Sequence, residues 1–482
     1  MIEENIEIHD KYQFEIKLAY KLIKQAKLNY YNIETYLFLP LNLGINSHTY
    51  KRDQFYTDIH SYIRLKTPEV PLKNITGKES PFSKLKKATN KISETYSPEE
   101  LSKWEYYVKM FLSIFRTSMR DHVLFTAKKE NKDDIKYLVE EYINLTKEIA
   151  SEYRELRHII NLPTLPKNIF DIYLMGDEFI SLSIENFTYE LLEKLKEKII
   201  EYKKDLLFII KKELEHRKAQ GFPSVPEEKS DNETYLFRKG VLKKFASSVL
   251  FLDTHHEKEG KLIEQLFYSF AAGVAMVFAT LVAFYTQKKY GQYTFPLFIA
   301  LVISYMFKDR IKELTRMYFA KKLRKRFFDH KTEIFVPNGK KIGLCKERFS
   351  FVKEKNVNPE IIKIRNRDTF TSMENDFLGE KIIYYRKFIK LYPKKISNAY
   401  KDYEINGIDD IIRFNISSFL RRMDDPKKTL YILTEDGYKK IKGERVYHIN
   451  MIIKFTTAND IRYKRFRLVL TREGLKRIEE VV

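Results

Sequence analysis

The chain has 482 residues, long enough for two or three domains that each bury a core of their own. Its formal net charge of +22 suits nucleic acid or anionic lipid, but the lysine-rich composition of the whole chain is the favoured explanation, and we expect no nucleic-acid partner. Cys345 is the only cysteine, which excludes an intrachain disulfide and a cysteine-based zinc site.

The first 80 residues contain two strand-like runs. Every second side chain is apolar in the first run, the pattern of a half-buried strand, and this face consists of Tyr12, Phe14, Ile16, Leu18 and Tyr20. The second run, 36–39, stops at Pro40. We therefore predict a strand pair within a small α+β segment at 1–80.

Helical patterns begin near residue 97. Ser97 is a good N-cap, because Pro98 and two glutamates follow it. A second helix is predicted from Asp133, and a third over 192–209, where apolar residues recur at heptad spacing. We predict a helical bundle at 81–221 and a linker with a juxtamembrane helix at 222–261.

Residues 262–307 are predicted to form a transmembrane hairpin. The first span, 266–286, has 21 residues without a charge, enough to cross a hydrocarbon core of about 30 Å. The second span, 294–307, is shorter, and a polar turn joins the two. Small residues recur every fourth position and would let another helix approach closely, either the second span or a second subunit: Ala271, Ala275, Ala279 and Ala283.

Basic residues flank the hairpin on the side of the chain ends. Because cytoplasmic flanks carry the excess of Lys and Arg, we expect both termini in the cytoplasm and the hairpin in the inner (plasma) membrane, with the bilayer as partner. A cytoplasmic helical stalk is predicted at 308–331. Its basic run would contact anionic lipid headgroups or a protein partner, or would only set the topology: Lys321, Lys322, Arg324, Lys325 and Arg326.

The remaining residues, 332–482, are predicted to form an antiparallel β sandwich or barrel. Strand-like runs include 341–352, 361–364 and 382–392, and Glu435, Asp436 and Gly437 mark the turn of a β-hairpin. A short tail helix is expected from Arg472. The predicted fold class is thus an α+β multidomain membrane protein with a helical bundle, a two-helix hairpin and a β domain.

No motif with the spacing of a known catalytic, cofactor or metal site occurs in the chain. The polar cluster 253–257 and the acidic pairs 409–410 and 424–425 carry suitable residue types, but we expect surface ion pairs and turns there. We therefore predict a membrane-anchored binding or scaffold protein without a cofactor. The alternatives are a subunit of an oligomeric pore or channel, for which the uncharged spans offer no ion path, and a membrane-tethered enzyme with an unrecognised site.

Overall fold

The computed structural model describes residues 2–337, 339–366, 379–435, 437–458 and 460–481, apart from the side chains of 197, 262, 321 and 323–326. The fold is a mixture of helices and antiparallel sheets, as the sequence predicts at this level. The chain divides into two compact units. The two-sheet unit comprises Met1–Ile63, Leu252–Lys401 and Gly407–Val482, and the helical unit comprises Arg64–Phe251 with Asp402–Asn406.

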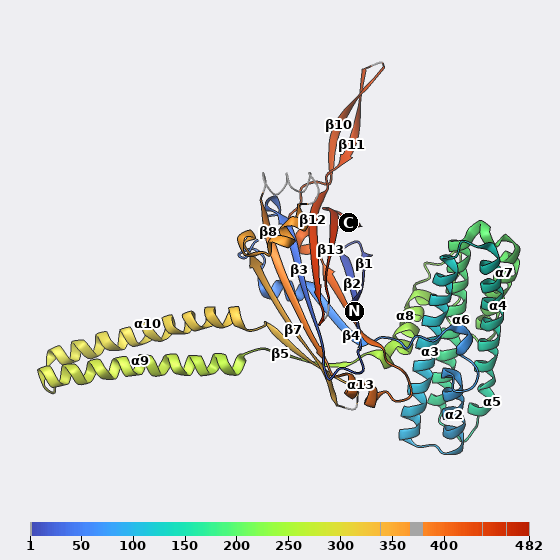
Figure 1. Ribbon diagram of the computed structural model, residues 1–482, viewed down its shortest axis with the longest axis horizontal. Coiled ribbons are helices and arrows are strands. Elements are labelled where there is room, and N and C mark those ends of the chain that lie inside the picture. Colours follow the sequence, from blue (N-terminus) through green and yellow to red (C-terminus); the bar gives the residue numbers. More distant parts are fainter. Residues whose placement is uncertain (1, 338, 367–378, 436, 459, 482) are drawn as a thin grey trace. The chain divides into compact units, whose positions relative to one another are not determined.

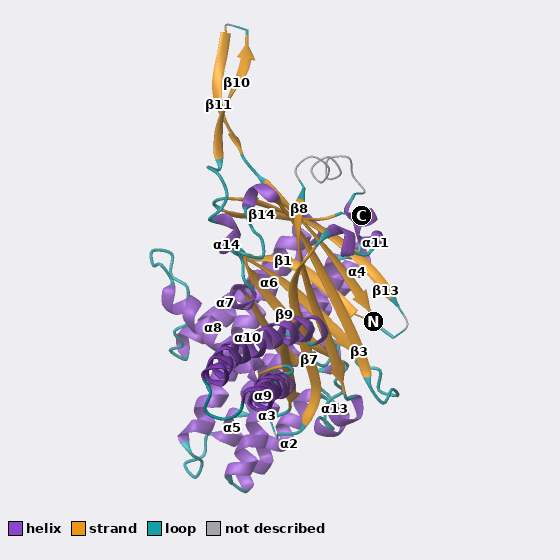
Figure 2. Cartoon of the chain, turned by 90° about the vertical axis from the view of Figure 1, so that its left-hand side faces the viewer, coloured by secondary structure: helices purple, strands orange, loops and turns teal. Residues whose placement is uncertain are grey.

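An antiparallel sheet of eight strands forms the larger layer of the two-sheet unit (Figures 1 and 2). Its strand order is β14-β13-β12-β3-β8-β7-β6-β5. The strands are β3 (Asn29–Pro40), β5 (Asp253–Lys258), β6 (His330–Phe335), β7 (Lys341–Val352), β8 (Glu380–Leu391), β12 (Tyr447–Thr456), β13 (Ile461–Thr471) and β14 (Gly474–Glu480). The N-terminal strand β3 lies in the middle, paired with β8 on one side and β12 on the other.

A second sheet of four strands covers one face of the first. Its order is β1-β2-β9-β4, built from β1 (Ile2–Asp10), β2 (Gln13–Lys21), β9 (Gly407–Asn415) and β4 (Ile59–Leu65, which continues past the end of the unit's first segment). The predicted alternation is confirmed within β2, where Phe14, Ile16, Leu18 and Tyr20 are buried, whereas Tyr12 precedes the strand and is 46 % exposed. Short helices complete the unit: α1 (Arg52–Asp58), α11 (Pro359–Arg365), α13 (Pro393–Ala399) and α14 (Ser417–Leu420).

The helical unit contains α2 (Pro81–Glu94), α3 (Pro98–Ala127), α4 (Lys132–Glu155), α5 (Arg157–Ile160), α6 (Lys167–Leu195), α7 (Lys203–Ala219) and α8 (Glu233–Ser247). The predicted start of α3 is confirmed, since the Ser97 side chain accepts a hydrogen bond from the Glu100 N–H at 3.2 Å. Trp104, the only tryptophan, is fully buried in this core and donates its indole N–H to Thr89 at 3.1 Å.

Three predictions of secondary structure were wrong. The heptad-like helix over 192–209 is interrupted, because Ile199 has non-helical angles and the chain turns there so that α7 packs on α6. Residues 361–364 are helical, since Asn358 caps α11 and Pro359 occupies its first turn. The tail expected to be a helix is strand β14, which pairs with β13.

Two long excursions leave the sheets of the two-sheet unit. The first consists of helices α9 (Lys261–Tyr290) and α10 (Phe295–Arg326), inserted between the paired strands β5 and β6. The second is the β-hairpin β10 (Lys427–Thr434) with β11 (Gly437–Glu444), which confirms the turn predicted at 435–437, although Asp436 lies outside the described residues. Figure 1 shows both excursions.

Candidate functional site

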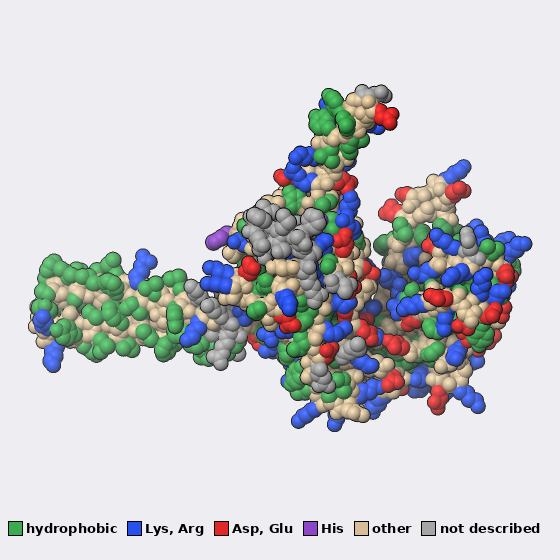
Figure 3. All heavy atoms as spheres, turned by 45° about the horizontal axis from the view of Figure 1, so that its top comes forward, with side chains coloured by type: hydrophobic (Ala, Val, Ile, Leu, Met, Phe, Trp, Pro, Cys, Tyr) green, Lys and Arg blue, Asp and Glu red, His purple; other side chains and the backbone are tan. Residues whose placement is uncertain are grey.

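Helix α9 exposes an apolar surface of unusual length. Among the residues that the structure describes, one helix is long and apolar enough to cross a membrane, Ile263–Tyr290, and 11 % of its most apolar stretch is buried. Large apolar side chains on it are more than half exposed: Leu266, Phe270, Met276, Val277, Leu281, Phe284 and Tyr285. Figure 3 shows the hairpin covered by hydrophobic side chains over much of its length.

Helix α10 is apolar only in its first part. Residues 295–307 carry no charge, and Lys308, Asp309 and Arg310 follow directly. This helix is therefore not apolar over the length that a membrane span requires. The second span, and with it the membrane hairpin, stays a prediction.

The two helices pack side by side in antiparallel fashion. Ala271 and Ala275 are buried on α9, whereas Ala279 and Ala283 are half-buried. The Ser304 hydroxyl donates to the Ala279 carbonyl oxygen at 3.4 Å. Toward the base, the Phe267 and Phe319 rings stack with centroids 4.6 Å apart, and the Arg316 guanidinium lies 4.4 Å from the ring centroid of Tyr268. The small residues of α9 thus face the other helix of the same chain.

These contacts place charged residues of α10 beside the uncharged stretch of α9. Ser304 is opposite Ala279, so Lys308, about one turn closer to the base, is opposite the turn around Ala275. Ala275 lies near the middle of the charge-free stretch 265–287, which is about 34 Å long at 1.5 Å per residue. A charge at the centre of a membrane helix costs about 2.5–3.5 kcal/mol on insertion scales. Sequence reasoning missed this conflict because it considered each span alone.

Two carboxylates fix the base of the hairpin to the sheet. Glu259, just before α9, accepts the Phe328 N–H at 2.7 Å and pairs with Lys346. Asp329, just after α10, accepts hydrogen bonds from Arg52 at 3.0 Å, from Tyr56 at 3.1 Å and from the Phe349 N–H at 2.7 Å. Both ends of the insertion are therefore held firmly.

The predicted basic contact lies mostly outside the described side chains. Lys321, Arg324, Lys325 and Arg326 belong to the last turns of α10, and their side chains are not described. Lys322 is exposed, with its ammonium 5.9 Å from the ring centroid of Tyr318. Their proposed contact with anionic headgroups remains a prediction.

A buried ionic cluster joins the two sheets. Lys387 on β8 and Asp410 on β9 are 1 % and 0 % exposed, and the Lys387 Nζ lies 2.6 Å from Asp410 Oδ2. Ser61 accepts from Lys387 and donates to Asp410, both at 2.7 Å, and the Tyr20 hydroxyl donates to Asp410 at 3.1 Å. Glu347 lies 3.7 Å from the Lys387 ammonium.

This cluster resembles a Ser–Lys nucleophile in composition but not in charge state. Burial alone lowers the pKa of Lys387, but the neighbouring Asp410 carboxylate, with smaller contributions that include Glu347, outweighs it and holds that pKa well above its ordinary value. A lysine kept protonated cannot take the proton of the Ser61 hydroxyl. Period-two burial places Lys387 on the same inward face as Tyr385 and Ile389, a signal that was present in the sequence.

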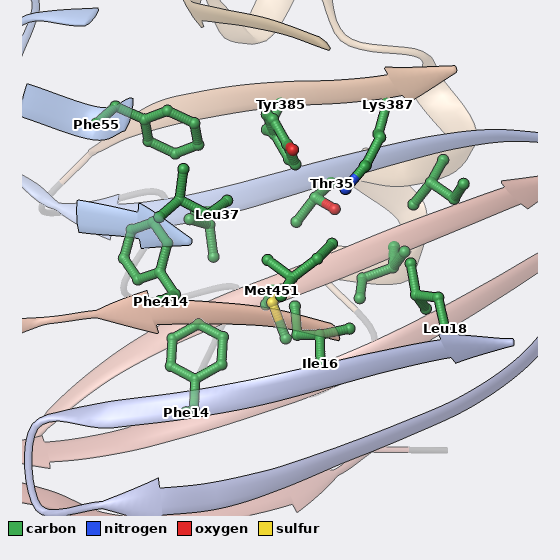
Figure 4. A pocket seen from close by; sticks show the side chains of 14 residues that line it. Phe14, Ile16, Leu18, Thr35, Leu37, Phe55, Tyr385, Lys387, Phe414 and Met451 are labelled. Atoms are coloured by element: carbon green, nitrogen blue, oxygen red, sulfur yellow. The ribbon is translucent and has the colours of Figure 1, made fainter. Parts of the chain in front are cut away.

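A cavity of about 30 Å³ lies between the sheets next to this cluster (Figure 4). Lys387, Thr35 and Tyr385 supply its few polar atoms, and apolar side chains such as Phe14, Leu37, Phe414 and Met451 form the rest. One water molecule needs about 10–15 Å³, whereas ligand pockets usually measure about 300–1,000 Å³. The cavity has room for water and not for a substrate.

A second polar network lies inside the helical unit. Arg154 on α4 bonds Asp177 at 3.0 Å and Glu213 at 2.6 Å, and His216 contacts Asp177 at 2.8 Å. Burial raises the pKa of Asp177, but its bonds to His216 and Arg154 outweigh this and lower it overall. The fully buried Arg217 pairs with Glu185. Each of these charged groups pairs with a group of opposite charge, as in a network that holds helices in register.

The acidic clusters noted in the sequence lie apart from one another. Asp424 accepts from Arg445 at 2.5 Å and from Tyr447 at 3.1 Å beside a polar pocket of about 280 Å³, and Asp425 pairs with Arg472 at 3.1 Å. Within 253–257, neighbouring side chains of strand β5 point to opposite faces. Among the described residues no group of three or more His, Cys, Asp or Glu could hold a metal ion.

No protein-family model, curated protein or solved structure matches this chain. The argument for function therefore rests on the hairpin and its surroundings.

Proposed function

We propose that this is a two-pass membrane protein anchored by the α9–α10 hairpin, with both termini on the cytoplasmic side of the inner (plasma) membrane. The two-sheet and helical units then serve as cytoplasmic binding or scaffold domains. The single observation that carries the proposal is the exposure of α9, because a long apolar helix in a soluble protein is normally buried in a core.

The distribution of charge supports the orientation. The tip of the hairpin carries Lys288 and Lys289, whereas α10 carries nine basic residues between Lys308 and Arg326. A cytoplasmic base accords with the positive-inside bias, and the basic end of α10 would then lie near anionic headgroups. The buried clusters have the character of structural ion pairs, which favours binding or scaffolding over catalysis.

Cysteine labelling in intact cells tests this topology. The native Cys345 is 1 % exposed and burial raises the pKa of its thiol well above the usual value, so it reacts slowly and leaves a clean background. Gln292→Cys places a thiol at the exposed tip, and the matched variant Thr429→Cys places one on the exposed β10 strand. A membrane-impermeant maleimide added to intact cells should label the tip variant and spare the β10 variant.

After permeabilisation both variants should be labelled to the same extent. Labelling of the β10 variant in intact cells would show that the two-sheet unit lies outside the cell, which is the opposite orientation. Release of the wild-type protein from membranes by alkaline carbonate would refute membrane spanning altogether, because that treatment removes peripheral proteins.

A further inference from the structure

Four charged residues in the middle of α10 share one side of the helix. Asp309, Lys312, Glu313 and Arg316 follow one another at intervals of three, four and seven residues from the first, which places them on one face. We call these four residues the charged stripe. Lys308 and Arg310 lie to either side of it, and the Lys308 ammonium sits 3.9 Å from the ring centroid of Tyr305.

The opposite face of α10 is apolar at the same level. Leu314 and Tyr318 lie opposite the charged stripe, and both are 62 % exposed. Between Lys308 and Phe319, beside the uncharged stretch of α9, α10 therefore has one face suited to lipid and an opposite face unsuited to it.

Among the described side chains, a single hairpin covers only the Arg316 end of the charged stripe, where Tyr268 of α9 lies against the guanidinium. Asp309, Lys312 and Glu313 are exposed, and the partner that Glu313 has within the chain is Arg316, at 3.6 Å on the same stripe. Charged residues at membrane depth face a bundle interior or a water-filled cavity and pair with one another. The stripe therefore requires a cover that the hairpin of one chain does not supply.

We propose that hairpins of two or more copies of this chain associate in the membrane through the charged stripe of α10, with α9 and the face of Leu314 and Tyr318 turned to lipid. This inference rests on the proposed membrane anchoring. Two properties favour a second copy over another protein. The stripe carries both signs, so Asp309 and Glu313 of one copy can meet Lys312 and Arg316 of the next. Copies inserted by the same hairpin also lie at the same depth in the membrane, so these charges face one another at the same height across the interface.

Cross-linking of the full-length protein at low protein-to-lipid ratio tests the interface. Lys312→Cys places a thiol on the stripe, and Leu281→Cys places one on the lipid-facing surface of α9, where Leu281 is 63 % exposed. Under mild oxidation the Lys312→Cys variant should form a disulfide-linked dimer with a yield at least five-fold above that of Leu281→Cys. Equal yields, or none from either, would overturn the proposal.

Mass measurement in lipid nanodiscs gives an independent readout. The wild-type chain should run as an oligomer, and Glu313→Lys should shift it toward the monomer, whereas the tip variant Lys288→Glu should not. A wild-type monomer would overturn the inference. Alkaline carbonate extraction separates the two hypotheses: a protein that stays in the membrane but is monomeric refutes only the association, and one that is extracted refutes the anchoring.

Discussion

The buried pair between Lys387 and Asp410 offers the sharpest test of how the two sheets are held together. Lys387→Met keeps most of the side-chain volume but removes the cation, leaving the Asp410 carboxylate fully buried with only the Ser61 and Tyr20 hydroxyls. Removing one partner of a buried ion pair costs about 3–5 kcal/mol, because the other charge stays uncompensated in a medium of low polarity. With a urea m-value of about 2–3 kcal/mol/M, the unfolding midpoint should fall by about 1–2.5 M.

The chain provides its own reporters for this measurement. Cys345 is buried in the two-sheet unit and Trp104 in the helical unit, and each is the only residue of its type. Thiol labelling of Cys345 against urea concentration therefore follows unfolding of the two-sheet unit, while tryptophan fluorescence follows the helical unit. Lys387→Met should move the first curve and leave the second unchanged.

Two further variants decide the interpretation. Lys390→Met on the same strand faces the other side of the sheet and is half-exposed, so its midpoint should change little. The double variant Lys387→Met/Asp410→Leu removes both charges and should recover most of the lost stability. A single variant within about 0.3 M of the wild type, or a double variant no more stable than the single one, would show that the pair does not stabilise the sheets as argued.

Two other predictions concern packing and pH. A Cβ on Gly176 would lie 2.0 Å from the hydroxyl oxygen of the buried Tyr153, so Gly176→Ala should destabilise the helical unit by about 1–3 kcal/mol in the tryptophan assay. The control Gly240→Ala, with no atom within 4 Å of its Cβ inside a helix, should stabilise it by about 0.5–1 kcal/mol, and equal effects would contradict the predicted clash. Burial lowers the pKa of His330 in the folded state, so as the pH falls the unfolded chain binds the proton before the folded chain does. The two-sheet unit should therefore lose stability below about pH 6.5, by at most about 1.4 kcal/mol per pH unit. Cys345 labelling, normalised to a free thiol at each pH, should show this slope, and His330→Gln should flatten it; an unchanged slope in that variant would exclude His330 as its source.

Much of the local structure could be predicted from the sequence. The Ser97 cap, the alternation in β2 and the turn before Gly437 all depend on residues close together in the chain, and the structure confirms each of them. The predictions at 361–364 and after Arg472 failed where a short apolar run fits either a helix or a strand, and where pairing with a distant strand decides between the two.

The sequence by itself therefore determined an uncharged, apolar helix around residues 265–287 and the basic segment that follows the hairpin. Only the tertiary structure decided that β3 lies between β8 and β12, that Lys387 meets Asp410, and that the charged half of α10 stands beside the apolar half of α9. The physical reason is that strand pairing, ion pairing across a core and the register of two helices each depend on residues far apart in the chain, which no local pattern records.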